Sequence, residues 1–375
     1  MDANSINHLP HVLVVAPNPD RREFLEATLS PYFEVTSDAD VDRVILADES
    51  ESARAQVIVI DQNGRTDPNS ERYLTHCERL KSKIPGLIAT AAPDLSFDLR
   101  DVAPKVPARF LRWPIERQDL LEAVSQVIGE KTEHIWREEL AEEIGKPLTY
   151  TVDEYQHISN AIAAGKPVDC EKAAESCKPL VDAVSTGNHH TLLTAVQSHH
   201  NYTYVHSMRV ATLLTLFGHG LGMTEDDLLV LSTGGLVHDV GKLVTPAEIL
   251  DKPGKLTEEE WPIMRDHVLH STKILGKSND VNRGVFIIAG QHHEKLDGSG
   301  YPNGLKSAEL NELARMSAIV DIFGALTDKR SYKPAFPTEK AFGILESMTE
   351  QIDQHLLGMF RDIFEPGSEV TQQAA

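Results

Sequence analysis

Four short runs rich in apolar residues lie in the first third of the chain, each closed by a turn. They cover residues 11–17, 55–64, 86–93 and 108–114. Two segments between or after them, 19–33 and 118–128, space their apolar residues as a helix does. Because the apolar character of the four runs is continuous, and does not alternate, we expect strands that are buried on both faces. The pattern therefore predicts a parallel α/β sheet.

The strand pattern ends after this region. Residues 130–165 are charged and compatible with a helix, and from about residue 166 every segment has helical spacing, with Gly- and Pro-containing loops between segments. The expected helices cover 169–186, 202–220, 225–243, 257–276, 282–294, 312–329 and 338–364. The predicted fold is multidomain: an α/β domain over 9–129, a helical linker over 130–165, and an all-α bundle over 166–365.

Charge and hydropathy narrow the classes of partner. The chain has 375 residues, with 36 Lys and Arg against 57 Asp and Glu, for a formal net charge of −21. This argues against nucleic acid and anionic membranes as partners, because both need a basic surface. A small phosphorylated ligand needs only a local group of cations. There is no apolar run of about 18 residues and no signal-like N-terminus, and the three cysteines lack paired spacing, so we expect a cytoplasmic protein.

Histidines are concentrated in one part of the chain, since eleven of the 17 lie between His189 and His293. Within this stretch VHDVGK places His238 beside Asp239, and Lys242 follows on the same helical face. Such a pair can direct an imidazole and a bridging carboxylate toward two metal ions. Taken alone, the same residues also fit an ordinary helix end, with Asp239 solvated and Lys242 near the negative end of the helix dipole.

A second pair, His292 and His293, ends an apolar helix and opens a glycine-rich loop over 294–304. Its glycines permit positive φ and close approach of the backbone to a ligand, although an ordinary surface turn explains the loop equally well. Three further residues are candidate metal ligands: His206, His267 and Asp321. Asp321 is the strongest of these, because a carboxylate within an apolar helix is costly unless it is paired or bound to metal.

In this order, HSMRVA, LVHDVGK, KPGKLTEEE, HHEKLDGSGYPNG and ALTDKRSYK resemble the HD-GYP branch of the HD metal-dependent phosphohydrolase superfamily, over about residues 170–363. The resemblance implies an HD-domain fold for the helical bundle. It also implies seven metal ligands, which are His206, His238, Asp239, His267, His292, His293 and Asp321. Some members add a glutamate four residues before the first ligand and recruit a third metal. Tyr202 stands at that position here, so the resemblance implies two metals.

Members of this family hydrolyse cyclic di-GMP, a bacterial second messenger, to pGpG and in some cases on to GMP. The resemblance implies iron or manganese, which suit mixed imidazole and carboxylate ligands, and a water acidified between two metals as the nucleophile. It gives catalytic roles to Asp239 and to Lys242, which would stabilise charge on the attacked phosphate. The implied substrate contacts are Gly300, Tyr301, Pro302, Arg330 and Lys333. Arg330 and Lys333 would grip phosphate, while Tyr301 and Pro302 would shape the loop.

One position departs from the family pattern. Members commonly carry a second aspartate three residues after the last ligand, where this chain has Gly324. The missing carboxylate weakens the case for turnover, though not for metal binding, because it could alter proton transfer or the outer contacts of the ligands. Two alternatives therefore stay open: a non-catalytic cyclic-di-GMP receptor that signals through protein contacts, and a phosphohydrolase for another cyclic dinucleotide.

The N-terminal segment resembles a response-regulator receiver, with a flavodoxin-like sheet, Asp61 as the phosphoacceptor and Thr90 at the switch position. Ala16 and Pro17 replace the acidic pair after the first strand, and Trp113 replaces the lysine of the last strand. Without these groups Mg²⁺ lacks its ligands and an aspartyl phosphate lacks its ion pair. We therefore expect an unphosphorylated, degenerate receiver. The expected partners are cyclic di-GMP, a signalling protein and a second copy in a homodimer. The signalling protein would bind through this domain or through the loop over 294–304, called the GYP loop after Gly300, Tyr301 and Pro302.

Overall fold

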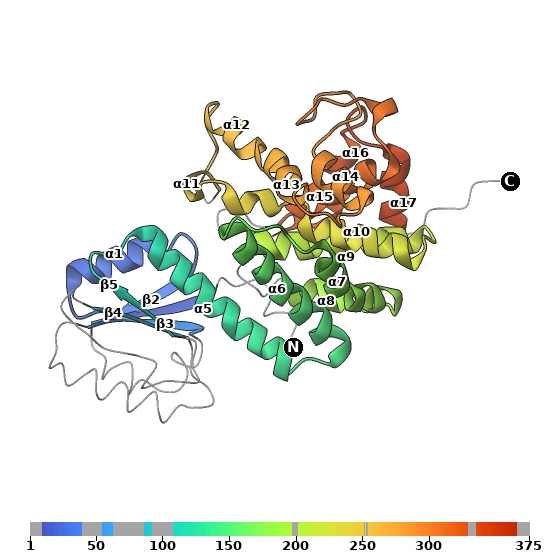
Figure 1. The fold of residues 1–375 in the computed structure, drawn as a ribbon. Coiled ribbons are helices and arrows are strands. Elements are labelled where there is room, and N and C mark those ends of the chain that lie inside the picture. The colour runs from blue at the N-terminus through green and yellow to red at the C-terminus, as the bar shows by residue number, and fades with distance from the viewer. Residues whose placement is uncertain are drawn as a thin grey trace. The chain divides into compact units, whose positions relative to one another are not determined.

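The structure is a computed structural model that describes residues 10–39, 55–62, 86–91, 108–196, 202–250, 252, 254–328 and 335–365. The chain divides between Ile135 and Trp136 into two compact units (Figure 1). Among the described residues, no helix combines the length and apolar character needed to cross a bilayer.

The first unit contains a five-stranded sheet in which every pair of neighbours is parallel. Its order is β2-β1-β3-β4-β5, from β1 (His11–Val15), β2 (Glu34–Asp38), β3 (Val57–Gln62), β4 (Gly86–Ala91) and β5 (Ala108–Arg112). This is the flavodoxin-like order of doubly wound sheets, in which ligands meet the carboxyl ends of the strands. The predicted parallel α/β sheet is confirmed, and side chains on both faces of β1 are buried, such as Val12 and Leu13.

Strand β2 was missed by the sequence prediction. Its sequence, EVTSD, is polar and only partly buried, because the strand lies at the edge of the sheet and pairs with β1 alone. Helices α1 (Pro19–Leu29) and α5 (Arg117–Glu138) correspond to the two predicted helices, although α1 ends before residue 33 and α5 continues well beyond residue 128. Both pack against one face of the sheet, where Leu25 and Leu120 are fully buried.

The second unit is helical, as predicted, and its only paired extended residues within the described ranges are an isolated bridge between Asp297 and Lys306. Its α-helices are α6 (Glu142–Ala163), α7 (Cys170–Ser185), α8 (His189–Val196), α9 (Tyr202–Gly220), α10 (Glu225–Val237), α11 (Ala247–Leu250), α12 (Glu260–Arg265), α13 (His267–Leu275), α14 (Arg283–Gln291), α15 (Glu312–Thr327), α16 (Thr338–Glu346) and α17 (Gln354–Phe364). Two short 3₁₀ helices, η3 (Val240–Val244) and η4 (Ser307–Glu309), complete it.

Three predicted helices are broken in the structure, and α8 and α11 were not predicted. The segment 225–243 changes at His238 from α10 to η3, the segment 257–276 breaks at Asp266, and the segment 338–364 is split before α17. The last break has a local cause, because the Asp353 carboxylate accepts hydrogen bonds from the first backbone N–H groups of α17.

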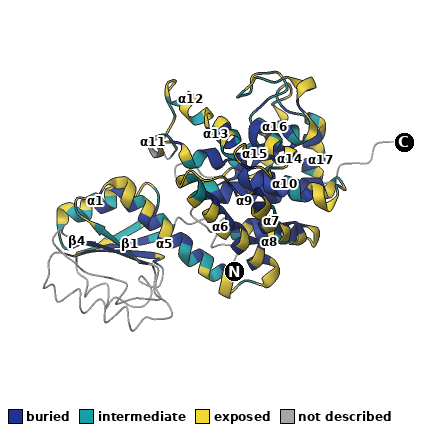
Figure 2. Ribbon diagram, in the orientation of Figure 1, coloured by how far each residue is buried: buried dark blue, intermediate teal, exposed yellow. Residues whose placement is uncertain are grey.

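Helices α9 and α10 lie at the centre of this unit and are mostly buried (Figure 2). They can approach closely because Gly235 of α10 has no side chain. A Cβ at this position would lie only 2.5 Å from the Ala211 Cα of α9. Helix α10 also packs against α14, and α9 against α15. The ends and inner faces of these helices carry the candidate site.

Candidate metal centre

The seven predicted metal ligands come from helices far apart in the sequence, and the structure brings all of them together. His206 lies on α9, His238 and Asp239 join α10 to η3, His267 begins α13, His292 and His293 follow α14, and Asp321 lies on α15. All except His293 are at most 5% exposed. Asp239 is therefore not a solvated residue at a helix end, although α10 does end beside it.

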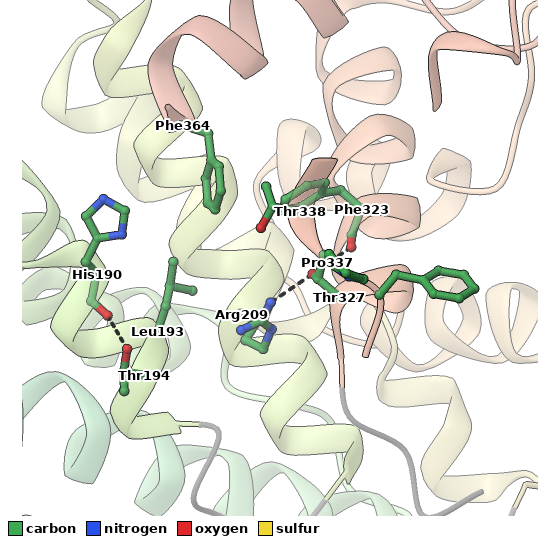
Figure 3. A pocket seen from close by; sticks show the side chains of 10 residues that line it. His190, Leu193, Thr194, Arg209, Phe323, Thr327, Pro337, Thr338 and Phe364 are labelled. Atoms are coloured by element: carbon green, nitrogen blue, oxygen red, sulfur yellow. Dashed lines mark hydrogen bonds between the residues drawn. The ribbon is translucent and has the colours of Figure 1, made fainter. Parts of the chain in front are cut away.

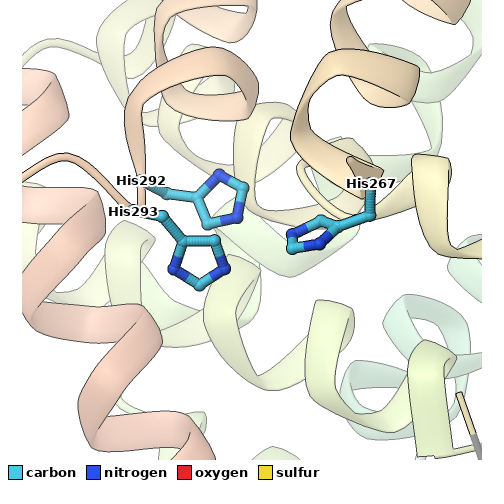
Figure 4. Close-up of side chains that lie close together, drawn as sticks. All are labelled: His267, His292 and His293. Carbon is cyan, nitrogen blue, oxygen red and sulfur yellow. The ribbon is translucent and has the colours of Figure 1, made fainter. Parts of the chain in front are cut away.

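The ligand atoms form two groups of three. One group is His267, His292 and His293, whose rings face one another in Figure 4, and the other is His206, His238 and Asp239. Within each group, the candidate atoms lie within 4.8 Å of one another, which leaves each group able to hold one ion.

Two carboxylates connect the two groups. Asp239 Oδ2 lies 3.2 Å from His238 Nε2, while its Oδ1 lies 3.2 Å from His267 Nε2. Asp321 Oδ1 is 2.9 Å from His206 Nε2, and its Oδ2 is 3.5 Å from His293 Nδ1. In each carboxylate, one oxygen faces one group and the second oxygen faces the other group. This arrangement suits two neighbouring cations that share bridging ligands.

Backbone hydrogen bonds select the tautomer of three histidines. His238 Nδ1 donates to Gly235 O at 2.7 Å, His267 Nδ1 donates to Met264 O at 2.6 Å, and His292 Nδ1 donates to carbonyls of α14 at 3.1 Å. A carbonyl can only accept, so each Nδ1 carries a hydrogen, and Nε2 is the atom that offers a lone pair to a metal when the ring is neutral.

The inward atoms of this site lack ordinary partners. The buried Nε2 atoms of His238, His267 and His292, and Oδ1 of Asp239, make no hydrogen bond. Unsatisfied buried polar atoms are rare and costly in native proteins. Four of them converging on one place, all of ligand type, fit a pair of divalent metal ions.

The same residues strongly influence one another's protonation. Burial alone would lower the pKa of His238, but the Asp239 and Asp321 carboxylates outweigh it and raise this pKa to about 10. Burial would raise the pKa of Asp239, yet His238 and Lys242 hold it well below its usual range. Burial lowers the pKa of His293 to about 3. The metal-free site thus holds ionised carboxylates and both charged and neutral imidazoles.

Metal uptake is therefore expected to displace protons. His238 is protonated below a pH of about 10 in the metal-free protein, whereas a metal binds neutral imidazole, so binding should release about one proton from this residue at pH 8. Apparent affinity should consequently fall as the pH is lowered from 10. Calorimetric titration of the full chain with Mn²⁺ in two buffers of different ionisation enthalpy measures the release. Equal heats in both buffers would show that His238 binds metal without losing a proton.

Lys242 lies beside the shared carboxylate, with its Nζ 2.5 Å from Asp239 Oδ2. Its side chain is mostly buried, at 17% exposure. A cation here compensates the negative charge of the Asp239 carboxylate.

The GYP loop is held in place by contacts with residues 293–295 at its start. The buried Glu294 carboxylate accepts hydrogen bonds from the backbone N–H groups of Asn303 and Leu305, at 2.7 and 2.9 Å. A Cβ on Gly300 would lie 2.4–2.6 Å from backbone atoms of residues 293–295, so only glycine fits there. The loop stacks the Tyr301 ring on His293, with centroids 4.6 Å apart, and Pro302 follows through a cis peptide bond.

Arg330 and Lys333 lie outside the described residues. The side chain of Tyr202 is also outside them, although its backbone begins α9.

Sequence reasoning missed Arg209 and Asp328. Asp328 Oδ2 accepts a hydrogen bond from His206 Nδ1 at 2.8 Å, and Arg209 forms an ion pair with the other oxygen of Asp328. Arg209 could have been noticed, because a charged residue within the apolar helix α9 needs a buried partner.

The aromatic face of Tyr301 also contacts a cation that was not predicted, since the Arg265 guanidinium lies 5.1 Å from its ring centroid.

In the first unit, the Asp61 carboxylate is fully engaged at the carboxyl end of β3. Oδ1 accepts hydrogen bonds from Thr90 Oγ1 and Trp113 Nε1, both at 2.7 Å. Arg21 Nη1 lies 3.2 Å and 3.3 Å from its two oxygens. Asp61 is 2% exposed. Arg21 therefore supplies a positive charge beside this buried carboxylate.

Comparisons with known proteins agree with the helical site. The match to the HD domain family covers residues 190–356. The chain is 41% identical over 145 residues to the 3'3'-cGAMP-specific phosphodiesterase 3 of Vibrio cholerae, covering 39% of this chain and 31% of that protein. It is 31% identical over 201 residues to the cyclic di-GMP phosphodiesterase PA4108 of Pseudomonas aeruginosa, covering 52% of this chain and 48% of that protein.

A third relative is the cyclic di-GMP phosphodiesterase response regulator RpfG of Xanthomonas campestris, 36% identical over 138 residues, which are 36% of each chain. The matches thus span less than half the length of these curated relatives. The motifs HDVGK and HHEKLDGSGYP lie within the residues that match the HD domain family. Residues 190–356 thus match the HD domain family, and over part of its length the chain is similar to proteins named as cyclic dinucleotide phosphodiesterases.

Proposed function

We propose that this protein is a two-metal phosphodiesterase that hydrolyses cyclic di-GMP to pGpG. The observation that carries the proposal is the pair of three-ligand groups joined by Asp239 and Asp321, with unsatisfied nitrogen atoms aimed between them. Five imidazoles and two carboxylates suit iron or manganese better than magnesium or calcium, which prefer oxygen ligands.

When bound, a metal pair supplies a water acidic enough to attack phosphorus at neutral pH. Asp239 and Asp321 would serve as ligands to both metals, and the backbone hydrogen bonds to the Nδ1 atoms fix the ring orientations of His238 and His267. Lys242 stabilises the charge that develops on the attacked phosphate. One P–O3′ bond breaks, and the departing 3′-oxygen takes up a proton to give linear pGpG. Arg330 and Lys333 would hold the second phosphate.

Two other functions have specific support. The absence of a carboxylate at Gly324 favours a receptor that binds the dinucleotide without turnover. The name of the 3'3'-cGAMP-specific relative favours a mixed cyclic dinucleotide as substrate. A pure receptor has no need for paired metal positions, so hydrolysis remains the better account.

A product-resolved assay separates these functions. The full chain, purified without oxygen and loaded with Fe²⁺ or Mn²⁺, is incubated with cyclic di-GMP or with 3'3'-cGAMP, and the products are separated by chromatography. We expect pGpG from cyclic di-GMP, and any GMP would appear later. Tight binding without product would establish the receptor, and faster cleavage of 3'3'-cGAMP would reassign the substrate.

We further propose that residues 9–129 are a degenerate receiver that regulates the HD-GYP domain at 166–365 through the linker at 130–165. Dimerisation or binding of a signalling protein would carry the signal, within the cytoplasm. Asp61 supports the proposal, because Arg21, Thr90 and Trp113 already satisfy both of its oxygens.

Acetyl phosphate with Mg²⁺ is accordingly expected to leave the protein unmodified. Phosphorylation would have to expose a buried carboxylate and displace Arg21 from it. Mass spectrometry of the intact protein measures the outcome, with Asp61→Asn as the matched control. A phosphate adduct on the unmutated protein that Asp61→Asn abolishes would overturn the prediction.

A further inference from the structure

Next to the candidate metal centre, four buried ionisable side chains contact one another in succession. Asp321 contacts His206 Nε2, Asp328 accepts from His206 Nδ1, and Arg209 pairs with Asp328. All four are at most 5% exposed. Ionisable groups with so little access to water need hydrogen-bonding or charged partners, and each of these four has one among its neighbours.

Arg209 is the member farthest along this series from Asp321, and Thr327 and Asp328 hold its side chain. Its guanidinium points from α9 toward the end of α15, where Nη2 donates to Thr327 Oγ1 at 2.9 Å (Figure 3). The Asp328 carboxylate is therefore fixed from both sides, by an arginine and by an imidazole. Its position is set by the packing of α9 against α15, and it follows directly after the last residue of α15.

Gly324 faces the same imidazole from one helical turn earlier. A Cβ built on Gly324 would lie 3.6 Å from His206 Cε1 and 3.7 Å from Nδ1, in ordinary contact. Positions 324 and 328 are four residues apart and so project from the same side of the helix. A carboxylate at either position can therefore reach the Nδ1 side of His206.

We propose that Asp328 is the positioning residue for His206, and that it replaces, from one turn further along, the carboxylate that Gly324 lacks. Asp328 keeps a hydrogen on Nδ1 and turns Nε2 toward the group that His206 forms with His238 and Asp239. Partners of this kind on the far nitrogen of a histidine ligand orient the ring and raise its basicity. The inference rests on the proposed metal site, but not on the identity of the substrate.

Exchange of the two positions tests this role. Asp328→Ser should weaken one of two Mn²⁺ affinities of the full chain by about 10- to 100-fold, while the affinity of the His267, His292 and His293 group stays unchanged. The double variant Gly324→Asp with Asp328→Ser should recover most of the loss. Mn²⁺ binding is followed by calorimetry and electron paramagnetic resonance, and unfolding by circular dichroism.

Asp353→Ser serves as the matched control. It removes another partly buried aspartate–arginine pair, in which Arg315 Nη1 lies 2.9 Å from Asp353 Oδ2, and neither residue is one of the seven proposed ligands. It should lower stability without altering either Mn²⁺ affinity. Two unchanged affinities in Asp328→Ser would overturn the role of Asp328.

If Asp328→Ser does not fold, the double variant decides. A folded double variant with two Mn²⁺ sites supports an exchangeable carboxylate, whereas a folded double variant that has lost one site contradicts it. Failure of the proposed function gives a different result, since wild-type protein would then bind two Mn²⁺ ions but release no pGpG.

Discussion

Asp239→Asn is expected to leave less than one metal ion per chain and to abolish hydrolysis. The two oxygens of Asp239 face different ligand groups, so the amide removes a negative ligand from both positions at once. Loss of an outer partner of a ligand already costs about 10- to 100-fold in affinity or activity, so loss of this shared ligand should cost more than about 100-fold in kcat/KM. Metal analysis and the product-resolved assay measure the two effects.

Asp266→Asn is the matched control for this variant. Asp266 precedes the proposed ligand His267, but its side chain is exposed and makes no capping hydrogen bond at the N-terminus of α13. Metal content and activity should stay at the wild-type level. Retention of two metals by Asp239→Asn would show that the carboxylate does not bridge the two groups.

Gly241→Ala is expected to destabilise the protein and to disrupt the metal centre together. A Cβ on Gly241 would lie 1.9 Å from His267 O and 2.6 Å from Ser271 N, and these are backbone atoms of α13. Relief of this overlap must move α13, which carries His267. Overpacking of a close interface typically costs about 1–3 kcal/mol, and the free energy of unfolding in urea should fall by at least this much.

A second glycine provides the comparison. Gly343 lies inside α16, and a Cβ there would meet nothing within 4 Å. Gly343→Ala should therefore stabilise the protein by about 0.5–1 kcal/mol, because alanine loses less conformational entropy in a helix. If Gly241→Ala unfolds at the wild-type urea concentration and keeps its metals, then η3 does not depend on this close contact.

The parts of the fold that sequence could predict are those with a strong local pattern. The apolar run at 55–64 became the buried strand β3, whereas the polar edge strand β2 carries no such run. The break at His238 escaped prediction for another reason. It depends on the contact between Gly241 and α13, and the apolar pattern on either side continues through it.

The same distinction applies to the candidate site. Asp321 could be singled out because a carboxylate in an apolar helix needs compensation, and the structure surrounds it with three imidazoles. Asp328 stands among polar residues and has no such local signal. Its pairing with His206 and Arg209 arises only when α9 packs against α15.

Titration of metal-free protein with Mn²⁺, while pGpG release from cyclic di-GMP is followed, tests the central claim most directly. Activity should stay near zero through the first equivalent, rise with the second, and level off at two ions per chain. A plateau at one equivalent, or two bound ions with no release of pGpG, would contradict the account.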